Sequence, residues 1–216
     1  MDVAYQLTLL VATKLVVYSF GSLIHFFLMV LILGNRRLRR FEWLLFALMA
    51  ALFMWYAGNL LALNISLSYG AGPALLSGFS CLLSLTGFML AVPLVIHVQV
   101  EYMWGLTPAQ RWQRMLVGSF YLPVMAWPWM AGSLLAHPGV EPMVALGRPV
   151  RLLVLWAVAA LLLAAGINLY LSGFRRRTDS RLARFHAYLA VLQGLLALGW
   201  AMVYLPHWLP AVGGLG

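Results

Sequence analysis

The sequence predicts an all-α fold, a polytopic membrane helix bundle with six transmembrane helices that forms a single domain over residues 1–216. Hydrophobic residues make up 64% of the chain and charged residues only 9%, a composition far from that of a soluble globular domain. Most of the basic residues fall in three short clusters, and long apolar stretches separate these clusters. A hydrocarbon core about 30 Å thick requires roughly 20 apolar residues of helix, and six stretches reach that length.

The spans follow one another with short connections. The first ends at the first basic cluster, and the second and third flank a turn rich in glycine at residues 68–73. The fourth contains Pro123 and Pro128, the fifth follows a Pro-Gly turn at residues 138–139, and the sixth follows the third basic cluster. None of these connections has room for a folded soluble domain. We place the six spans near residues 6–34, 43–63, 74–104, 115–136, 150–173 and 187–206.

The basic clusters predict the orientation of the chain. The first, third and fifth connections hold four, two and five arginines, whereas the opposite side holds only two. Lysine and arginine are retained on the cytoplasmic face during insertion, so we expect both termini outside and the clusters inside. The clusters are Arg36, Arg37, Arg39 and Arg40; Arg111 and Arg114; and Arg175, Arg176, Arg177, Arg181 and Arg184, and the two opposite arginines are Arg148 and Arg151.

The net charge of +9 is explained by this topology. Each arginine near an anionic leaflet contributes about 1 kcal/mol of attraction to the membrane surface. The predicted partner is therefore the lipid bilayer with its anionic inner leaflet, and no nucleic acid is expected. The N-terminus begins Met-Asp-Val and lacks a basic region with a small-residue cleavage site, so we do not interpret it as a cleaved signal peptide.

Ionisable side chains inside a bilayer are costly, and each is a candidate functional residue. The candidates within the predicted spans are Lys14, His25, His97 and Glu101. Lys14 is the only lysine of the chain, about two turns from the outer end of the first span, and its long stem can reach the interface. The alternatives for Lys14 are an ion pair and contact with a ligand carboxylate.

His25 and His97 share a predicted depth, on the order of 10 to 14 Å from the cytoplasmic boundary at 1.5 Å per helical residue. Glu101 follows His97 by one turn on the same helical face, so the three side chains converge if the first and third helices touch. Three chemistries fit: a haem b with two histidine ligands, a transition-metal site, or a proton-responsive hydrogen-bonded cluster. The alternative is a buried histidine that a neighbouring helix satisfies.

Pro93 lies one turn before His97. Because proline has no N–H, the carbonyl of Met89 loses its helical partner, and such a helix kinks or opens locally. Pro93 and His97 together therefore predict a ligand pocket or a hinge. Proline also occurs in membrane helices for packing alone.

The chain contains no catalytic motif. It has no glycine-rich phosphate loop, no Gly-x-Ser-x-Gly, no His-Glu-x-x-His and no Cys-x-x-Cys. No internal repeat of broken helices is visible, which disfavours a secondary transporter. We therefore expect that the chain is not itself an enzyme. Asn168 and Gln193 are interpreted as polar groups that join helices.

Two stretches, one at residues 34–48 and 54–61 and one at residues 93–97 with Tyr121-Leu122-Pro123, resemble the multi-pass, seven-helix type of sensor region in bacterial membrane histidine kinases. Residues 34–48, followed by 54–61, resemble its basic first inner loop and its apolar second helix with a central aromatic residue. Residues 93–97 and Tyr121-Leu122-Pro123 are similar to the proline-plus-histidine pattern of its third helix and the Tyr-x-Pro pattern of its fourth. The resemblance covers about a third of the chain. It implies a multi-pass protein of the bacterial inner membrane.

The resemblance implies a sensory input domain that passes a stimulus through helix rearrangement to a cytoplasmic or partner effector. Such sensors continue into a kinase domain, and this sequence ends at Gly216 without one. We therefore expect either the front part of a longer protein or a stand-alone relative that acts through a partner, as a homodimer or within a membrane complex. The alternatives are a haem- or metal-binding membrane subunit that uses His25 and His97, and a structural accessory subunit without a site.

Overall fold

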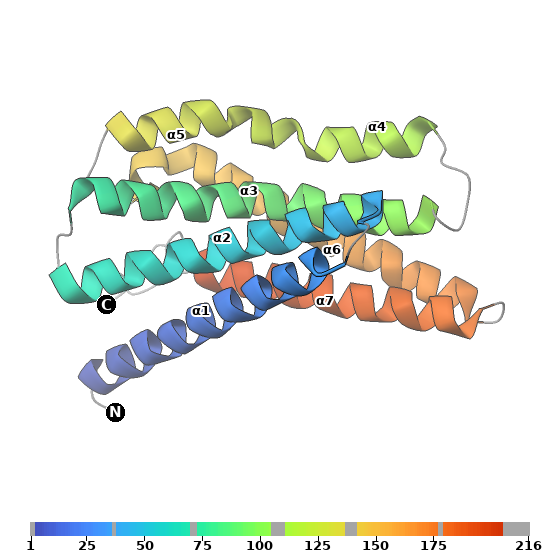
Figure 1. The fold of residues 1–216 in the computed structure, drawn as a ribbon, viewed down its shortest axis with the longest axis horizontal. Coiled ribbons are helices and arrows are strands. Elements are labelled where there is room, and N and C mark those ends of the chain that lie inside the picture. The colour runs from blue at the N-terminus through green and yellow to red at the C-terminus, as the bar shows by residue number, and fades with distance from the viewer. Residues whose placement is uncertain are drawn as a thin grey trace, which may run out of the picture. The chain divides into compact units, whose positions relative to one another are not determined.

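The structure, a computed structural model, describes residues 3–35, 38–69, 73–104, 111–136, 142–176 and 179–204. Every element in these ranges is helical, which confirms the all-α prediction (Figure 1). The elements are α1 (Val3–Leu33), α2 (Arg40–Tyr69), α3 (Ala74–Trp104), α4 (Arg111–Phe120), the 3-10 helix η1 (Leu122–Ala126), α5 (Trp127–Ala136), α6 (Pro142–Arg175) and α7 (Ser180–Tyr204).

Within these ranges, five helices are long and apolar enough to cross a membrane. They are Val11–Leu33, Arg40–Tyr69, Ala74–Tyr102, Arg148–Arg175 and Ser180–Ala201. Large apolar side chains on them face outward, as they do in a lipid solvent; Leu23 of α1, for example, is 66% exposed. The chain is therefore a helical membrane protein.

The predicted fourth span, 115–136, is not one helix. It is divided among α4, η1 and α5, and α4 and α5 have only 10 residues each. The break follows from Pro123, which occupies the start of η1 and lacks the N–H that a continuing α-helix would need. The backbone tightens instead, and the N–H of Val124 donates to the carbonyl of Tyr121 at 3.0 Å.

The chain divides into two compact units, residues 1–146 and 147–216. In the first unit, α3 contacts α2, α4, η1 and α5, whereas α1 packs on α2. Side-chain hydrogen bonds join these elements; for example, Asn59 Nδ2 of α2 donates to Ser84 Oγ at 2.9 Å, and Trp127 Nε1 of α5 donates to Thr86 Oγ1 at 2.8 Å. The first unit is thus organised around α3.

Two glycines allow α2 and α3 to approach closely. A Cβ at Gly58 would lie 2.5 Å from the backbone nitrogen of Ser84 and 2.7 Å from the carbonyl oxygen of Ser80. A Cβ at Gly87 would collide with the backbone of Ala51 and Trp55. Because apolar burial supplies no driving force between helices in lipid, such close packing at small residues is a main source of their association.

The second unit holds most of α6 together with α7. Each of these helices buries one stripe of side chains at helical spacing. The stripe of α7 repeats every seven residues in two interleaved series, one of alanines and one of larger side chains. The buried residues of α7 are Ala183, Ala190 and Ala197 in the first series and His186, Gln193 and Trp200 in the second.

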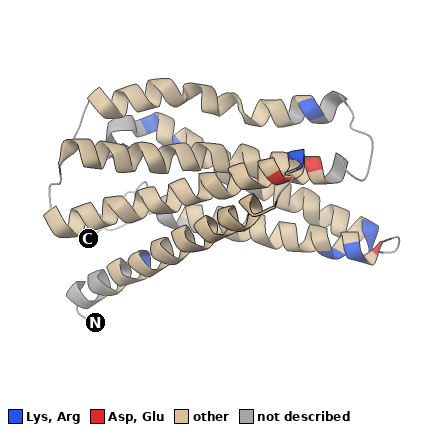
Figure 2. Cartoon of the chain, in the orientation of Figure 1, with Lys and Arg blue, Asp and Glu red and all other residues tan. Residues whose placement is uncertain are grey.

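Charged residues gather near the ends of the apolar helices (Figure 2). In the first unit, Arg39 and Arg40 lie at the start of α2, where Glu42 accepts the backbone N–H of Arg39 at 2.6 Å and so caps the helix. In the second unit, Asp179 and its neighbouring arginines lie between α6 and α7. Arg36, Arg37 and Arg177 of the predicted clusters lie outside the described residues.

Candidate functional site

The kink-prone segment of α3 lies inside the first unit. Pro93 is fully buried, and its neighbours Met89, Val92 and Leu94 are buried as well. The helix nevertheless continues to Trp104. Pro93 therefore lies within a packed helix, and the face one turn further along carries His97.

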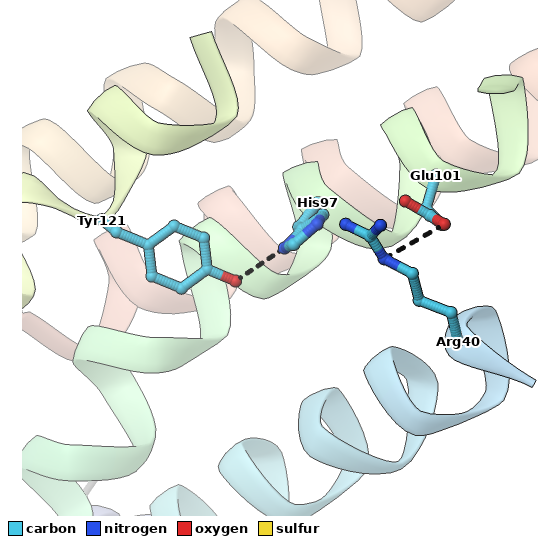
Figure 3. Close-up of polar contacts among 4 residues, drawn as sticks. All are labelled: Arg40, His97, Glu101 and Tyr121. Atoms are coloured by element: carbon cyan, nitrogen blue, oxygen red, sulfur yellow. Dashed lines mark hydrogen bonds and ion pairs between the residues drawn. The ribbon is translucent and has the colours of Figure 1, made fainter. Parts of the chain in front are cut away.

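His97 forms a hydrogen bond with Tyr121, which lies at the turn between α4 and η1. His97 Nδ1 and Tyr121 Oη are 3.1 Å apart, and the two rings meet edge-on, with centroids 5.9 Å apart (Figure 3). Tyr121 is held at this place because the proline after Leu122 ends α4 and opens the 3-10 turn. The contact therefore joins the segment that contains Pro93 to the turn that precedes Pro123.

Glu101, one turn beyond His97, pairs with Arg40 at the start of α2. Arg40 Nε lies 3.4 Å from Glu101 Oε1. The Arg40 side chain is 70% exposed, whereas that of Glu101 is only 15% exposed. The second carboxylate oxygen, Oε2, is buried and has no hydrogen-bond partner in the part of the chain that the structure describes. This ion pair extends the polar contacts of His97 to the arginine-bearing end of α2 (Figure 3).

His25 makes its contacts on α1 and α2. Its Nδ1 donates to the carbonyl of Gly21 at 2.6 Å, because a carbonyl oxygen can only accept. Its ring stacks on Tyr56, with centroids 5.2 Å apart and 22° between the planes. Lys14 is half-buried on α1. The contacts found for His25 are thus separate from those that join His97 to Tyr121 and Glu101 to Arg40.

The described ranges contain no group of three or more His, Cys, Asp and Glu side chains placed to hold a metal ion. His25, His97 and Glu101 therefore do not form a three-ligand site in these ranges. A haem held by two histidines requires no third ligand, and this interpretation stays a prediction.

A polar cluster in the second unit was not predicted as a unit from the sequence. His186 Nδ1 donates to Asn168 Oδ1 at 2.8 Å, and Asn168 Nδ2 donates to Gln193 Oε1 at 2.8 Å. All three side chains are almost completely buried. Because Nδ1 carries the proton, neutral His186 keeps a lone pair on Nε2. This atom is buried without a hydrogen-bond partner among the residues described.

The signal for this cluster is the seven-residue repeat of α7. The span predicted from hydropathy began at residue 187, one residue after His186, because Arg181 and Arg184 lower the local hydropathy. In the structure α7 begins at Ser180, so His186 lies on the same buried stripe as Gln193 and Trp200.

Comparison with models of protein families, with curated proteins and with solved structures gives no match for this chain. Its function is therefore argued from its own residues.

Proposed function

We propose that this chain is a membrane-embedded sensory input domain, in which a stimulus at His97 changes the packing of α3 against α4 and η1. The observation that carries the proposal is the hydrogen bond between His97 and Tyr121, because it joins the break between α4 and η1 to the proline-containing helix α3. Helix shifts at such breaks are a common element of switching proteins.

The polar contacts of His97 suggest where a change would be read. Glu101 lies one helical turn from His97, and its partner Arg40 is exposed at the start of α2. A rotation of α3 that lengthens the contact between His97 and Tyr121 would also move Glu101 relative to Arg40. Such a rotation therefore alters the arginine-rich surface, which in the proposed topology faces the cytoplasm and an effector there.

Protonation is the simplest stimulus that this site supports. Histidine is the side chain that ordinarily changes charge between pH 5 and 8. His97 contacts the uncharged phenol of Tyr121 directly. The charged groups beside it are Glu101, one helical turn away, and Arg40, which pairs with Glu101. A proton on His97 leaves both ring nitrogens as donors. Tyr121 would then act as the acceptor, and the carboxylate of Glu101 would be drawn toward the imidazolium.

The proposal is tested by pulsed EPR on the full chain in lipid nanodiscs. Nitroxide labels on Trp43→Cys and Met115→Cys, in a Cys81→Ser background, report the distance between α2 and α4. Both positions are exposed. We expect the distance distribution to change between pH 8 and pH 5, and the change to be lost in His97→Gln. A distribution that depends neither on pH nor on His97 would refute the proposed switch.

The orientation is part of the proposal. We infer that α4, η1 and α5 together complete a sixth crossing, so that the N-terminus lies outside and the arginine clusters lie inside. Three single cysteines at exposed positions, again in the Cys81→Ser background, test it: Asn35→Cys, Tyr69→Cys and Ser180→Cys. An impermeant maleimide added to intact cells should label only Tyr69→Cys. Labelling of Asn35→Cys or Ser180→Cys from outside would contradict the topology.

A second candidate function is a haem-binding membrane subunit with His25 and His97 as ligands. The observation in its favour is that each imidazole uses Nδ1 for a protein hydrogen bond, an arrangement that leaves Nε2 for a metal. A visible absorption spectrum of the protein purified from haem-supplemented cells tests it. A haem band that disappears in both His25→Ala and His97→Ala would establish this function, and a colourless wild-type protein would discard it.

A further inference from the structure

A groove opens between α1 and α2 at the end of the first unit where these helices are joined. Its volume is about 390 Å³, within the range of roughly 300 to 1,000 Å³ that ligand sites occupy. Apolar side chains form its walls, and Asn35 and Glu42 form its mouth. The apolar lining residues are Leu28, Leu31 and Ile32 of α1 and Leu45 and Met49 of α2.

The groove runs along the membrane normal if the two helices cross the bilayer. Leu28 of α1 and Asn35, two residues beyond the end of α1, are seven residues apart, which corresponds to roughly 10 Å at 1.5 Å per helical residue. The polar mouth lies next to Arg39, whose backbone N–H contacts Glu42, and the apolar walls lead away from it toward the middle of the helices. An occupant therefore needs an apolar chain and a polar head at one end.

The charged residues at the mouth of the groove determine whether the polar head of the occupant is anionic or cationic. Both carboxylate oxygens of Glu42 are engaged: Oε1 accepts from Asn35 Nδ2 at 3.2 Å, and Oε2 accepts from the backbone N–H of Arg39 at 2.6 Å. The same contact places the backbone of Arg39 at the mouth, and the Arg39 residue is exposed. Four of the five residues 36–40 are arginines. The local excess of positive charge favours an anionic head.

We propose that this groove binds one acyl chain of an anionic phospholipid, whose phosphate lies against Arg39. Basic pockets at the cytoplasmic ends of transmembrane helices are known sites for such headgroups. The acyl chain covers Leu31 and Ile32, which otherwise leave a gap between α1 and α2. This site is separate from His97, and it does not depend on the proposed sensory function.

Native mass spectrometry of the full chain, released from micelles that contain phosphatidylglycerol, tests the site. Ile32→Trp fills the groove, and Arg39→Gln removes the charge at its mouth. The matched controls are Leu33→Trp, on a neighbouring residue of α1 that does not line the groove, and Arg184→Gln, an exposed arginine of the other unit. We expect the fraction of protein that retains lipid to fall at least fivefold in Ile32→Trp and in Arg39→Gln. It should stay within twofold of wild type in both controls.

The lipid itself is varied in the same experiment. Phosphatidylcholine with identical chains should be retained at least fivefold less than phosphatidylglycerol, and glycerol phosphate without chains should not be retained. Equal retention of phosphatidylcholine, or equal loss in the control variants, would overturn the proposal. A dimer that Ile32→Trp dissociates would overturn it too, because a second copy of the chain would then be the occupant. If Ile32→Trp does not fold, Leu28→Phe takes its place, because it narrows the same groove. Loss of lipid retention is then judged from Leu28→Phe and Arg39→Gln together.

Discussion

The hydroxyl of Tyr121 lies 3.1 Å from Nδ1 of His97, and this contact connects a broken helix to a helix that contains an internal proline. Tyr121 lies directly after the last residue of α4 and precedes the 3-10 helix η1, and its phenol points toward His97 of α3 (Figure 3). The hydrogen bond therefore lies between the break that follows α4 and the helix that contains Pro93.

Removal of this hydrogen bond should destabilise the first unit modestly. Side-chain hydrogen bonds between membrane helices are worth about 0.6 kcal/mol on average and at most roughly 1.7 kcal/mol. We expect Tyr121→Phe to lower the free energy of unfolding in mixed micelles by an amount in that range. Tyr170→Phe is the control, because Tyr170 is 72% exposed. Equal stability of Tyr121→Phe and wild type would mean that the bond contributes nothing to packing.

The close contact of α2 and α3 makes a stronger prediction. In Gly58→Ala or Gly87→Ala the new methyl group would meet backbone atoms, which side-chain rotation does not relieve. Overpacking of this kind costs about 1–3 kcal/mol, and we expect each variant to lose that much stability. Gly118→Ala is the matched control, because a Cβ there has nothing within 4 Å. It should be neutral or stabilising by up to about 1 kcal/mol, since alanine favours a helix over glycine.

The polar cluster of the second unit should be sensitive to loss of its central amide. Asn168→Ala removes the acceptor of His186 and the donor to Gln193, both of which are buried. A buried polar group left without its partner costs about 1–3 kcal/mol. Hydrogen exchange of α6 and α7 should therefore accelerate in Asn168→Ala. It should not change in Asn64→Ala, because the hydrogen bond of exposed Asn64 among the described residues is to the carbonyl of Leu60 on its own helix. Unchanged exchange in Asn168→Ala would contradict this interpretation of the cluster.

Asp179 should make the start of α7 depend on pH. Its carboxylate accepts the backbone N–H groups of Leu182 and Arg181, each at 3.0 Å. The hydrogen bond from Leu182 is the main cause that lowers the pKa of Asp179; the N–H of Arg181 and the charges of Arg181 and Arg175 act in the same direction. A lowered pKa means that the folded state favours the ionised carboxyl. Its stabilising effect is thus complete above the ordinary aspartate pKa of about 3.9 and is lost as the pH falls through the lower folded value.

The measurement is the exchange of the Arg181 and Leu182 amides between pH 5 and pH 2, corrected for intrinsic rates. Protection should fall with pH in the wild type. In Asp179→Asn it should stay constant, because asparagine also caps a helix but does not titrate in this range. A wild-type profile as flat as that of Asp179→Asn would show that the carboxylate does not cap α7.

Hydropathy and charge were sufficient to predict most of the helices, because the apolar length and the arginine clusters are properties of the local sequence. Hydropathy and charge did not predict the break at residues 121–126. Pro123 was visible in the sequence, but proline in a membrane helix has several outcomes, from a mild kink to a change of helix type. The choice of a 3-10 turn depends on how α3 packs against both halves, and this packing has no local signature.

The candidate site was predicted only in part. The spacing of His97 and Glu101 placed them on one face, and the structure agrees that they are adjacent turns of α3. Their partners, Tyr121 and Arg40, come from other elements and were not identifiable without the tertiary fold. His25 was assigned to the same site as His97 because the two histidines share a predicted depth in the membrane. Depth alone does not determine which face of a helix points toward its neighbours. The buried position of His186, in contrast, has a signal in the sequence, because His186 lies at seven-residue spacing from Gln193, which lies at the same spacing from Trp200.

The division of the segment 111–136 into α4, η1 and α5 has a consequence for the biogenesis of the protein. Each 10-residue helix extends only about 15 Å, half of a hydrocarbon core. If this segment forms the sixth crossing proposed above, neither half is long enough to span the core alone, and its insertion would depend on contacts with α3 such as the hydrogen bond from Trp127 to Thr86. Under that topology, truncation of α3 should release residues 111–136 from the bilayer, whereas a continuous apolar helix would insert without help.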